Sequence, residues 1–203
     1  PERFGDPDPA PSNPIRYTEL LKTQSTMVAS WPTVQRVHES RPALAVLAEI
    51  NGGLGGTFFE EIRTRRGLAY QVSTFNQNRM LAGEFSVFVA CTPDSLPTVK
   101  SLVSELTRAL AASPPTEAQL DRAKAALVGS WMIGGQTNAA RIGRIASLTL
   151  SGQPLSDLDA WPDRIMAVSR EDLEYVASTW LDREPVATGM LLGKSGSDAD
   201  PGR

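Results

Sequence analysis

The stretch GLGGTFFEEIRTRRGLAY, from Gly53 to Tyr70, carries more information about the fold than any other part of the sequence. Its apolar residues recur every four positions, at Leu54, Phe58 and Ile62, which is the spacing of one buried helical face. Gly67 follows as a residue that can adopt positive φ and end the helix. We therefore expect a short helix, over about residues 57–66, that stops abruptly and leads straight into a strand.

The two ends of this stretch each allow a local interpretation. The glycines of NGGLGG (residues 51–56) suit a turn between two helices, which we favour over a phosphate loop because neither G-x-x-x-x-G-K-[S/T] nor G-x-G-x-x-G is present. At the other end, cations in a last helical turn interact favourably with the helix dipole, and Leu68 can fold back onto the helix as in a Schellman motif. The cations concerned are Arg63, Arg65 and Arg66. By itself, this interpretation leaves Tyr70 as an ordinary strand residue.

The rest of the chain alternates between strand-like and helix-like apolar patterns. Strands are expected over about residues 23–31, 68–76, 83–92 and 185–193. Helices are expected over about residues 42–50, 96–110, 116–131, 138–150, 155–168 and 169–181. The strand over residues 83–92 is apolar on both faces, which is typical of an inner strand. Together these elements predict an α/β (α+β) sandwich with a mixed, largely antiparallel sheet.

Length and composition indicate one folded domain. The chain has 203 residues, of which 41% are hydrophobic and 21% charged, as in globular proteins. We expect a proline-rich linker or arm over residues 1–22, a single domain over residues 23–193 and a flexible tail over residues 194–203. Because the first residue is proline and not methionine, we expect a fragment of a longer protein.

Charge and residue counts exclude several classes of function. A net charge of −3 and a pI of about 5.3 argue against nucleic acid or an anionic membrane as the main partner. No apolar run approaches the roughly 20 residues that span a bilayer. One cysteine, Cys91, allows no intrachain disulfide, and one histidine, His38, allows neither H-E-x-x-H nor H-x-x-E-H. This chain cannot supply the usual ligands of a zinc site.

The remaining chemical candidates all have a plain structural interpretation. His38 lies in a polar stretch before a proline, so we expect a surface loop residue. Cys91 lies in an apolar strand and is expected to be a small core residue. Arg141 and Arg144 could form a solvated helix face or a partner contact, and we favour the solvated face.

The segment GGLGGTFFEEIRTRRGLAYQV, from Gly52 to Val72, resembles the signature of the C-terminal, non-metal-binding half-domain of the insulinase/pitrilysin family of zinc metallopeptidases. Later segments also resemble the family, which includes processing peptidases and the core subunits of the cytochrome bc1 complex. These are TPDSLPTVKSLVSELTRAL (residues 92–110), TEAQLDRAKAALVGS (residues 116–130) and VSREDLEYVASTWL (residues 168–181). The resemblance covers about residues 23–193 and implies a sheet with helices packed mainly on one face.

The resemblance also implies a division of labour between two half-domains that close around a peptide. One half carries H-x-x-E-H and a distant glutamate and binds zinc. The other half supplies an arginine and a tyrosine seven residues apart, which correspond here to Arg63 and Tyr70. An arginine offers fixed donors for substrate carbonyls, and a phenol can donate to the oxyanion of a tetrahedral intermediate.

This sequence lacks H-x-x-E-H, so the resemblance implies the non-metal half, inactive on its own. We expect no cofactor in this chain and zinc in the partner half. The expected partners are a zinc-bearing half-domain or subunit and a peptide substrate, with no nucleic acid and no membrane span. The alternative is a non-catalytic assembly subunit, which would have no need of Arg63 and Tyr70. A small-molecule binding domain is a weaker possibility that rests only on the glycines.

Overall fold

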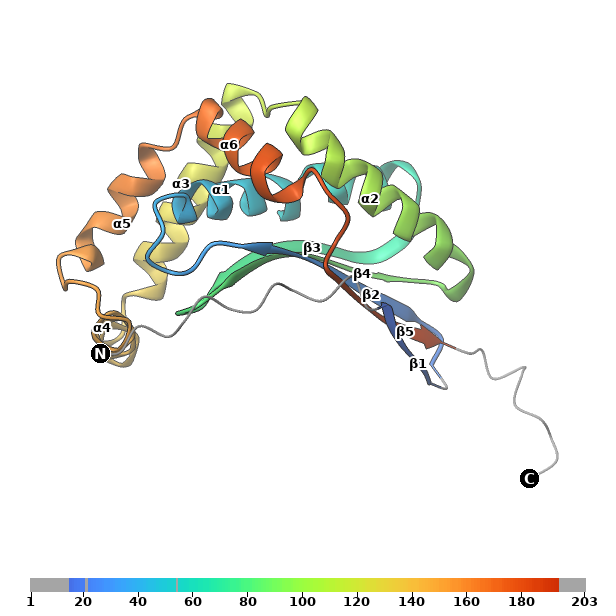
Figure 1. Cartoon of the computed structure of the whole chain (residues 1–203), viewed down its shortest axis with the longest axis horizontal. Coiled ribbons are helices and arrows are strands. Elements are labelled where there is room, and N and C mark those ends of the chain that lie inside the picture. Colours follow the sequence, from blue (N-terminus) through green and yellow to red (C-terminus); the bar gives the residue numbers. More distant parts are fainter. Residues whose placement is uncertain (1–14, 21, 54, 194–203) are drawn as a thin grey trace.

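Five strands form a single sheet in a computed structural model, which describes residues 15–20, 22–53 and 55–193 (Figure 1). The strand order is β1-β5-β2-β4-β3, and every neighbouring pair is antiparallel except β1 and β5, which run parallel. The strands are β1 (Ile15–Leu20), β2 (Ser25–Thr33), β3 (Ala69–Asn78), β4 (Gly83–Cys91) and β5 (Ala187–Gly193). This confirms the mixed, largely antiparallel sheet that the sequence predicts.

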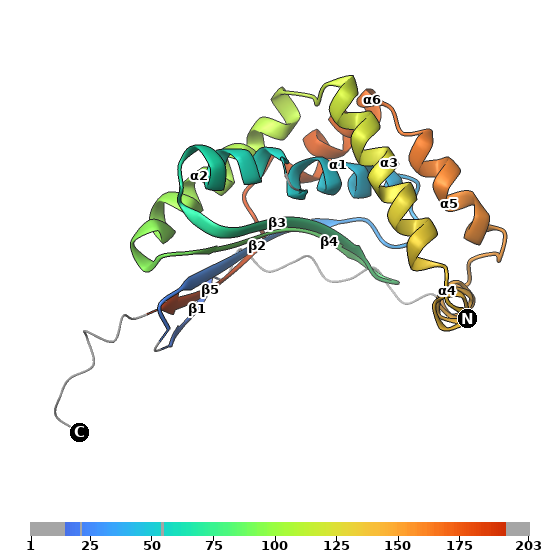
Figure 2. The same ribbon diagram turned by 180° about the vertical axis from the view of Figure 1, so that it is seen from behind.

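The helices cover one face of this sheet, as Figures 1 and 2 show from opposite sides. Helix α4 instead projects at one end of the molecule, and none of its residues is buried. The α-helices are α1 (Arg41–Gly52), α2 (Leu96–Ala112), α3 (Glu117–Gly134), α4 (Asn138–Leu150), α5 (Asp157–Met166) and α6 (Arg170–Val176). The described residues also form two π-helices, η1 (Phe59–Arg65) and η3 (Ala177–Leu181), and a 3₁₀ turn, η2 (Pro93–Ser95). No helix in the described part of the chain has both the length and the apolarity needed to cross a membrane.

The core lies between the sheet and the helices, and β4 contributes several of its most buried side chains. Alternate residues of β4, at Phe85, Val87 and Val89, are completely buried. Trp31 of β2 pairs with Phe85, and their rings meet edge to face with centroids 6.5 Å apart. Because β4 lies between β2 and β3, the inner strand expected from its two apolar faces is confirmed.

Two capping boxes begin helices where the sequence predicts them. The backbone N–H of Gln119 donates to Thr116 Oγ1 at 3.3 Å, and the Gln119 side chain accepts in return from the Thr116 N–H at 2.9 Å. Ser169 and Asp172 exchange the same pair of bonds at 2.8 and 3.1 Å before α6. These caps satisfy backbone donors that the first turn of a helix leaves free.

The structure differs from the expectations in two places. Residues 15–20, within the stretch expected to be a linker or arm, form the edge strand β1; every residue of β1 is exposed, so no buried face marks it in the sequence. Residues 1–14 and 194–203 lie outside the described residues.

Arg144 does not lie on a solvated face, which is the second difference. Its guanidinium covers the ring of Trp131 at 3.6 Å and donates to the Trp131 carbonyl. A Cβ on Gly135 would lie 2.4 Å from Arg144 Nη1, so a larger residue at position 135 would displace the end of the Arg144 side chain.

Candidate functional site

The helix predicted between the glycine turn and β3 is present, and most of it is the π-helix η1. Phe58 and Ile62 are completely buried and hold the segment against the core. The glycine turn before it is confirmed, because Gly55 has φ +85° and the Gly56 N–H donates to the Gly53 carbonyl at 2.7 Å. π-Helical turns often occur at functional sites, where their wider winding redirects side chains.

Gly67 ends η1 in the way the sequence predicts. Its φ of +62° lies in the left-handed region, and its N–H donates to the Arg63 carbonyl at 3.1 Å. The N–H of Leu68 then donates to the Ile62 carbonyl at 2.9 Å, so the chain folds back onto the helix before entering β3.

Tyr70 lies on a β-bulge at the beginning of β3. Its neighbours Ala69 and Gln71 pair with the consecutive residues Cys91 and Ala90 of β4, which leaves Tyr70 as the extra residue. Its side chain is 54% exposed, and no described residue forms a hydrogen bond with its hydroxyl. Bulges of this kind occur beside active sites and re-aim a side chain, so the Tyr70 hydroxyl is available to a partner or substrate.

Arg63 is also available, in contrast to the arginines that follow it. Glu61 forms ion pairs with Arg65 at 2.6 Å and with Arg66 at 4.0 Å. The Arg63 guanidinium instead lies 5.0 Å from the ring centroid of Phe59, and no carboxylate of the described residues forms an ion pair with it. The cation–π contact holds the guanidinium of this exposed side chain near the Phe59 ring without occupying its N–H donors.

The structure therefore places Arg63 and Tyr70 on either side of the Gly67 stop. Within the described residues no hydrogen bond or ring contact joins the two side chains to each other. The sequence indicates the helix stop, but the π-helix and the bulge are visible only in the structure. The two free polar groups suit the binding of a polar ligand supplied from outside this chain.

The histidine and cysteine of the described residues each have a structural environment that does not suit a metal ligand. His38 Nδ1 accepts a hydrogen bond from the Ser40 N–H at 3.1 Å, and its ring packs edge-on against Trp180. Cys91 is completely buried, and burial raises the pKa of its thiol. Among the residues that the structure describes, no group of three or more His, Cys, Asp or Glu side chains could hold a metal ion.

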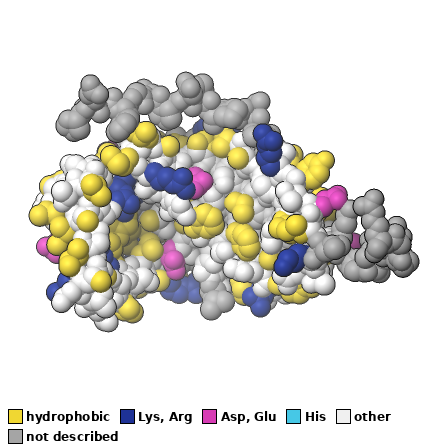
Figure 3. Space-filling model, turned by 90° about the horizontal axis from the view of Figure 1, so that it is seen from below, with side chains coloured by type: hydrophobic (Ala, Val, Ile, Leu, Met, Phe, Trp, Pro, Cys, Tyr) yellow, Lys and Arg dark blue, Asp and Glu magenta, His cyan; other side chains and the backbone are white. Residues whose placement is uncertain are grey.

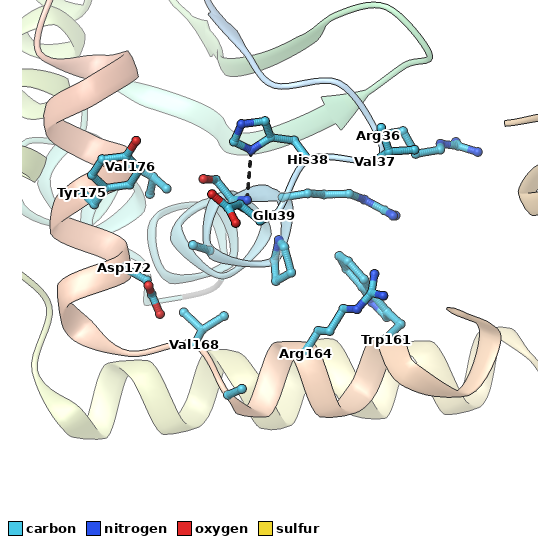
Figure 4. Close-up of a pocket in the computed structure, with 15 residues that line it drawn as sticks. Arg36, Val37, His38, Glu39, Trp161, Arg164, Val168, Asp172, Tyr175 and Val176 are labelled. Atoms are coloured by element: carbon cyan, nitrogen blue, oxygen red, sulfur yellow. Dashed lines mark hydrogen bonds between the residues drawn. The ribbon is translucent and has the colours of Figure 1, made fainter. Parts of the chain in front are cut away.

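A second polar site, which sequence analysis missed, lies at the start of α1 (Figure 4). It is a cavity of about 680 Å³ between the loop that precedes α1 and the helices α5 and α6. Arg36, Arg41, Arg164 and Trp161 are among the residues that line it. These come from separate segments and form no local motif, so only the fold brings them together.

Comparison with known proteins places the chain among peptidase domains. The profile of the family described as "Peptidase M16 inactive domain" matches residues 1–127. A protein of Streptomyces coelicolor named as an uncharacterized zinc protease is 29% identical over 177 residues, which are 86% of this chain and 39% of that protein. A Mycobacterium tuberculosis protein with the same description is 31% identical over 166 residues, which are 81% of this chain and 37% of that protein. This chain thus spans about two fifths of the length of the curated relatives it matches.

A solved structure shares the fold over nearly the whole chain. The peptidase M16 inactive domain from Pseudomonas fluorescens superimposes with a TM-score of 0.83 at 21% identity, covering 94% of this chain and 46% of that one. At this identity the likeness concerns the fold alone.

Proposed function

Because this chain belongs to the peptidase M16 family as an inactive domain, we propose that it is the non-metal half of a zinc endopeptidase and serves a catalytic half that lies outside it. The observation that carries the proposal is the pair Arg63 and Tyr70. Both are exposed, and both lie on irregular backbone at one helix stop. No described residue forms a hydrogen bond or an ion pair with the Arg63 guanidinium or the Tyr70 hydroxyl.

In this proposal the two residues act on the peptide substrate. The guanidinium of Arg63 donates to backbone carbonyls of the peptide and fixes its position. When water adds to the scissile carbonyl, the carbonyl oxygen becomes an oxyanion, and the Tyr70 hydroxyl donates a hydrogen bond to it. The zinc is expected in the other half, since this sequence lacks H-x-x-E-H and contains one histidine and one cysteine.

The surface near α4 supports pairing with another protein segment. Strongly exposed apolar side chains lie at the end of α3 and on α4, namely Met132, Ile133, Ile142 and Leu150, each at least 66% exposed. Figure 3 views the helix-free face of the sheet and shows hydrophobic side chains also at the end of the molecule where α4 lies. Contiguous exposed apolar surface commonly marks a protein–protein contact, here suited to the partner half.

The second candidate function is a non-catalytic assembly subunit of the same family. The apolar surface of α4 would serve this function equally well, because it requires only a partner and no substrate. The Arg63 guanidinium and the Tyr70 hydroxyl favour the catalytic assignment, since an assembly subunit does not require two exposed polar groups that lack hydrogen-bond partners.

The experiment that separates these functions is reconstitution with the H-x-x-E-H-bearing half encoded in the same genome, fused or as a separate subunit. Hydrolysis of an internally quenched peptide is measured for this chain alone, the zinc-bearing half alone and both together. We expect activity only when both are present, and less than one zinc per ten molecules of this chain alone by metal analysis. A complex of the two that forms but cleaves no peptide would support the assembly function instead.

A further inference from the structure

The cavity at the start of α1 is separate from the Arg63 and Tyr70 site. Its 680 Å³ is within the range of pockets that hold small molecules. A smaller hollow adjoins this cavity and shares three lining residues with it, Arg36, Arg41 and Trp161. This hollow is also lined by residues 76–79, which lie at the end of β3 and just beyond it. Tyr70 is the second residue of β3, so the cavity and the proposed catalytic pair lie toward opposite ends of that strand.

Arg41 is a partly buried cation without a counter-ion. Its guanidinium lies 4.2 Å from the ring centroid of Trp161. Burial, reinforced by the positive charges of Arg36 and Arg164, lowers the pKa of Arg41 to about 10. None of the ion pairs formed by the described residues includes Arg41. Taking a cation out of water without a counter-ion is unfavourable, and repulsion from two further cations adds to that cost.

Nearby carboxylates are engaged elsewhere or are exposed. Asp157 forms an ion pair with Arg164 at 2.7 Å, and its influence on Arg41 is weaker than that of the two arginines. Asp172 accepts from the Ser169 N–H as a helix cap, and Figure 4 shows it on the opposite side of the cavity from Arg164. Glu39 also lines the cavity but is an exposed residue of the loop. The arginine side of the cavity therefore retains an excess of positive charge.

The backbone beside Arg41 adds to this preference for negative charge. Helix α1 has no acidic residue in its first turn, and the Ser40 side chain does not cap it. The N-terminus of an α-helix carries a partial positive charge that favours an anion. At this helix the Arg41 N–H already donates to the His38 carbonyl and Pro42 has no N–H, so the Ala43 N–H is the free donor of the first three residues. A carboxylate or phosphate placed here would meet this helix end and the arginine side chains together.

We propose that this cavity binds a small anion bearing a carboxylate or phosphate group, held by the guanidinium of Arg41 against the ring of Trp161. A planar guanidinium matches both groups through two parallel hydrogen bonds. The anion neutralises the excess charge, and the indole provides an apolar wall for the rest of the ligand. The anion is either a free one or the C-terminal carboxylate of a short peptide, and the experiment distinguishes these sources. The proposal is independent of any peptidase activity.

Isothermal titration calorimetry of the isolated chain at constant ionic strength tests this site. The probes are inorganic phosphate, citrate, and one tripeptide with either a free or an amidated C-terminus. We expect saturable binding of at least one probe with one site per chain and a Kd below about 1 mM. Binding of phosphate or citrate identifies a free anion, whereas binding of only the tripeptide with a free carboxylate identifies a peptide end.

Two variants separate the cavity from general charge effects. Arg41→Gln should weaken binding at least tenfold while leaving thermal stability equal or higher, because it removes a cation that its neighbours repel. Arg122→Gln removes one positive charge from an exposed position on α3 and should leave the Kd unchanged. The proposal would be overturned if no probe gave saturable binding, or if Arg41→Gln and Arg122→Gln weakened binding equally.

Discussion

Replacing Gly67 with alanine tests whether the connection from η1 to β3 depends on the positive φ of Gly67. Gly67 has φ +62°, and an added Cβ would have no atom within 4 Å, so the substitution creates no collision. Its cost is the strain of an L-residue in left-handed backbone, about 1–2 kcal/mol. A stiffer unfolded chain offsets part of this, which leaves a net loss of about 1 kcal/mol in the free energy of unfolding. For a chain of this size that is a fall in Tm of roughly 2–4 °C.

The assay is urea and thermal unfolding followed by circular dichroism, with two matched variants. Gly67→Asn should lose less stability than Gly67→Ala, because asparagine tolerates left-handed backbone better than alanine. Gly129→Ala should stabilise the protein by about 0.5–1 kcal/mol, because Gly129 lies inside α3 with no atom within 4 Å of an added Cβ. If both alanine variants were equally stable, or if Gly67→Asn were no better than Gly67→Ala, the argument from backbone conformation would fail.

Three further predictions concern the site, the core and a helix cap. Arg63→Ala should raise the KM of the reconstituted peptidase at least as much as it lowers kcat, and it should leave Tm unchanged. The control is Arg65→Ala, which should alter neither kinetic constant because Arg65 is paired with Glu61. Equal kinetics for both variants would show that Arg63 does not belong to the site. Cys91 should resist iodoacetamide at pH 8 in the native chain and react with it in urea. Burial excludes the reagent and raises the pKa of the thiol, and only the thiolate is nucleophilic. Rapid labelling of the native chain would contradict the burial of Cys91. Ser169→Ala should cost about 1 kcal/mol of stability in urea unfolding by removing the cap of α6, and an unchanged midpoint would show that the cap contributes nothing.

Periodicity and capping chemistry predict most of this fold because they act over a few neighbouring residues. The apolar residues on both faces of residues 83–92 predict an inner strand, and Thr116 and Ser169 mark two helix starts that the structure confirms. Strand β1 escapes prediction because both of its faces are exposed, so its position depends only on backbone pairing with β5.

The site is less predictable than the fold, for reasons that are also physical. The π-helix around Arg63 and the bulge at Tyr70 each add one residue to a regular hydrogen-bond pattern, and no residue type marks such an addition. Arg41 and Arg164 are 123 positions apart in the chain, and only the packing of α1 beside α5 brings them to one cavity. The contact between Arg144 and Trp131 was not predicted because the two residues lie 13 positions apart on different helices, α4 and α3.

The most direct test of the central claim is the kcat of the reconstituted peptidase with Tyr70→Phe in this half. The hydroxyl is bound by no described residue and the ring is 54% exposed, so the substitution should leave Tm and assembly unchanged. Losing one oxyanion donor should lower kcat by about 10²- to 10³-fold. A Tyr70→Phe complex that assembles normally and cleaves peptide at the wild-type rate would contradict the proposal that this half takes part in catalysis through Tyr70.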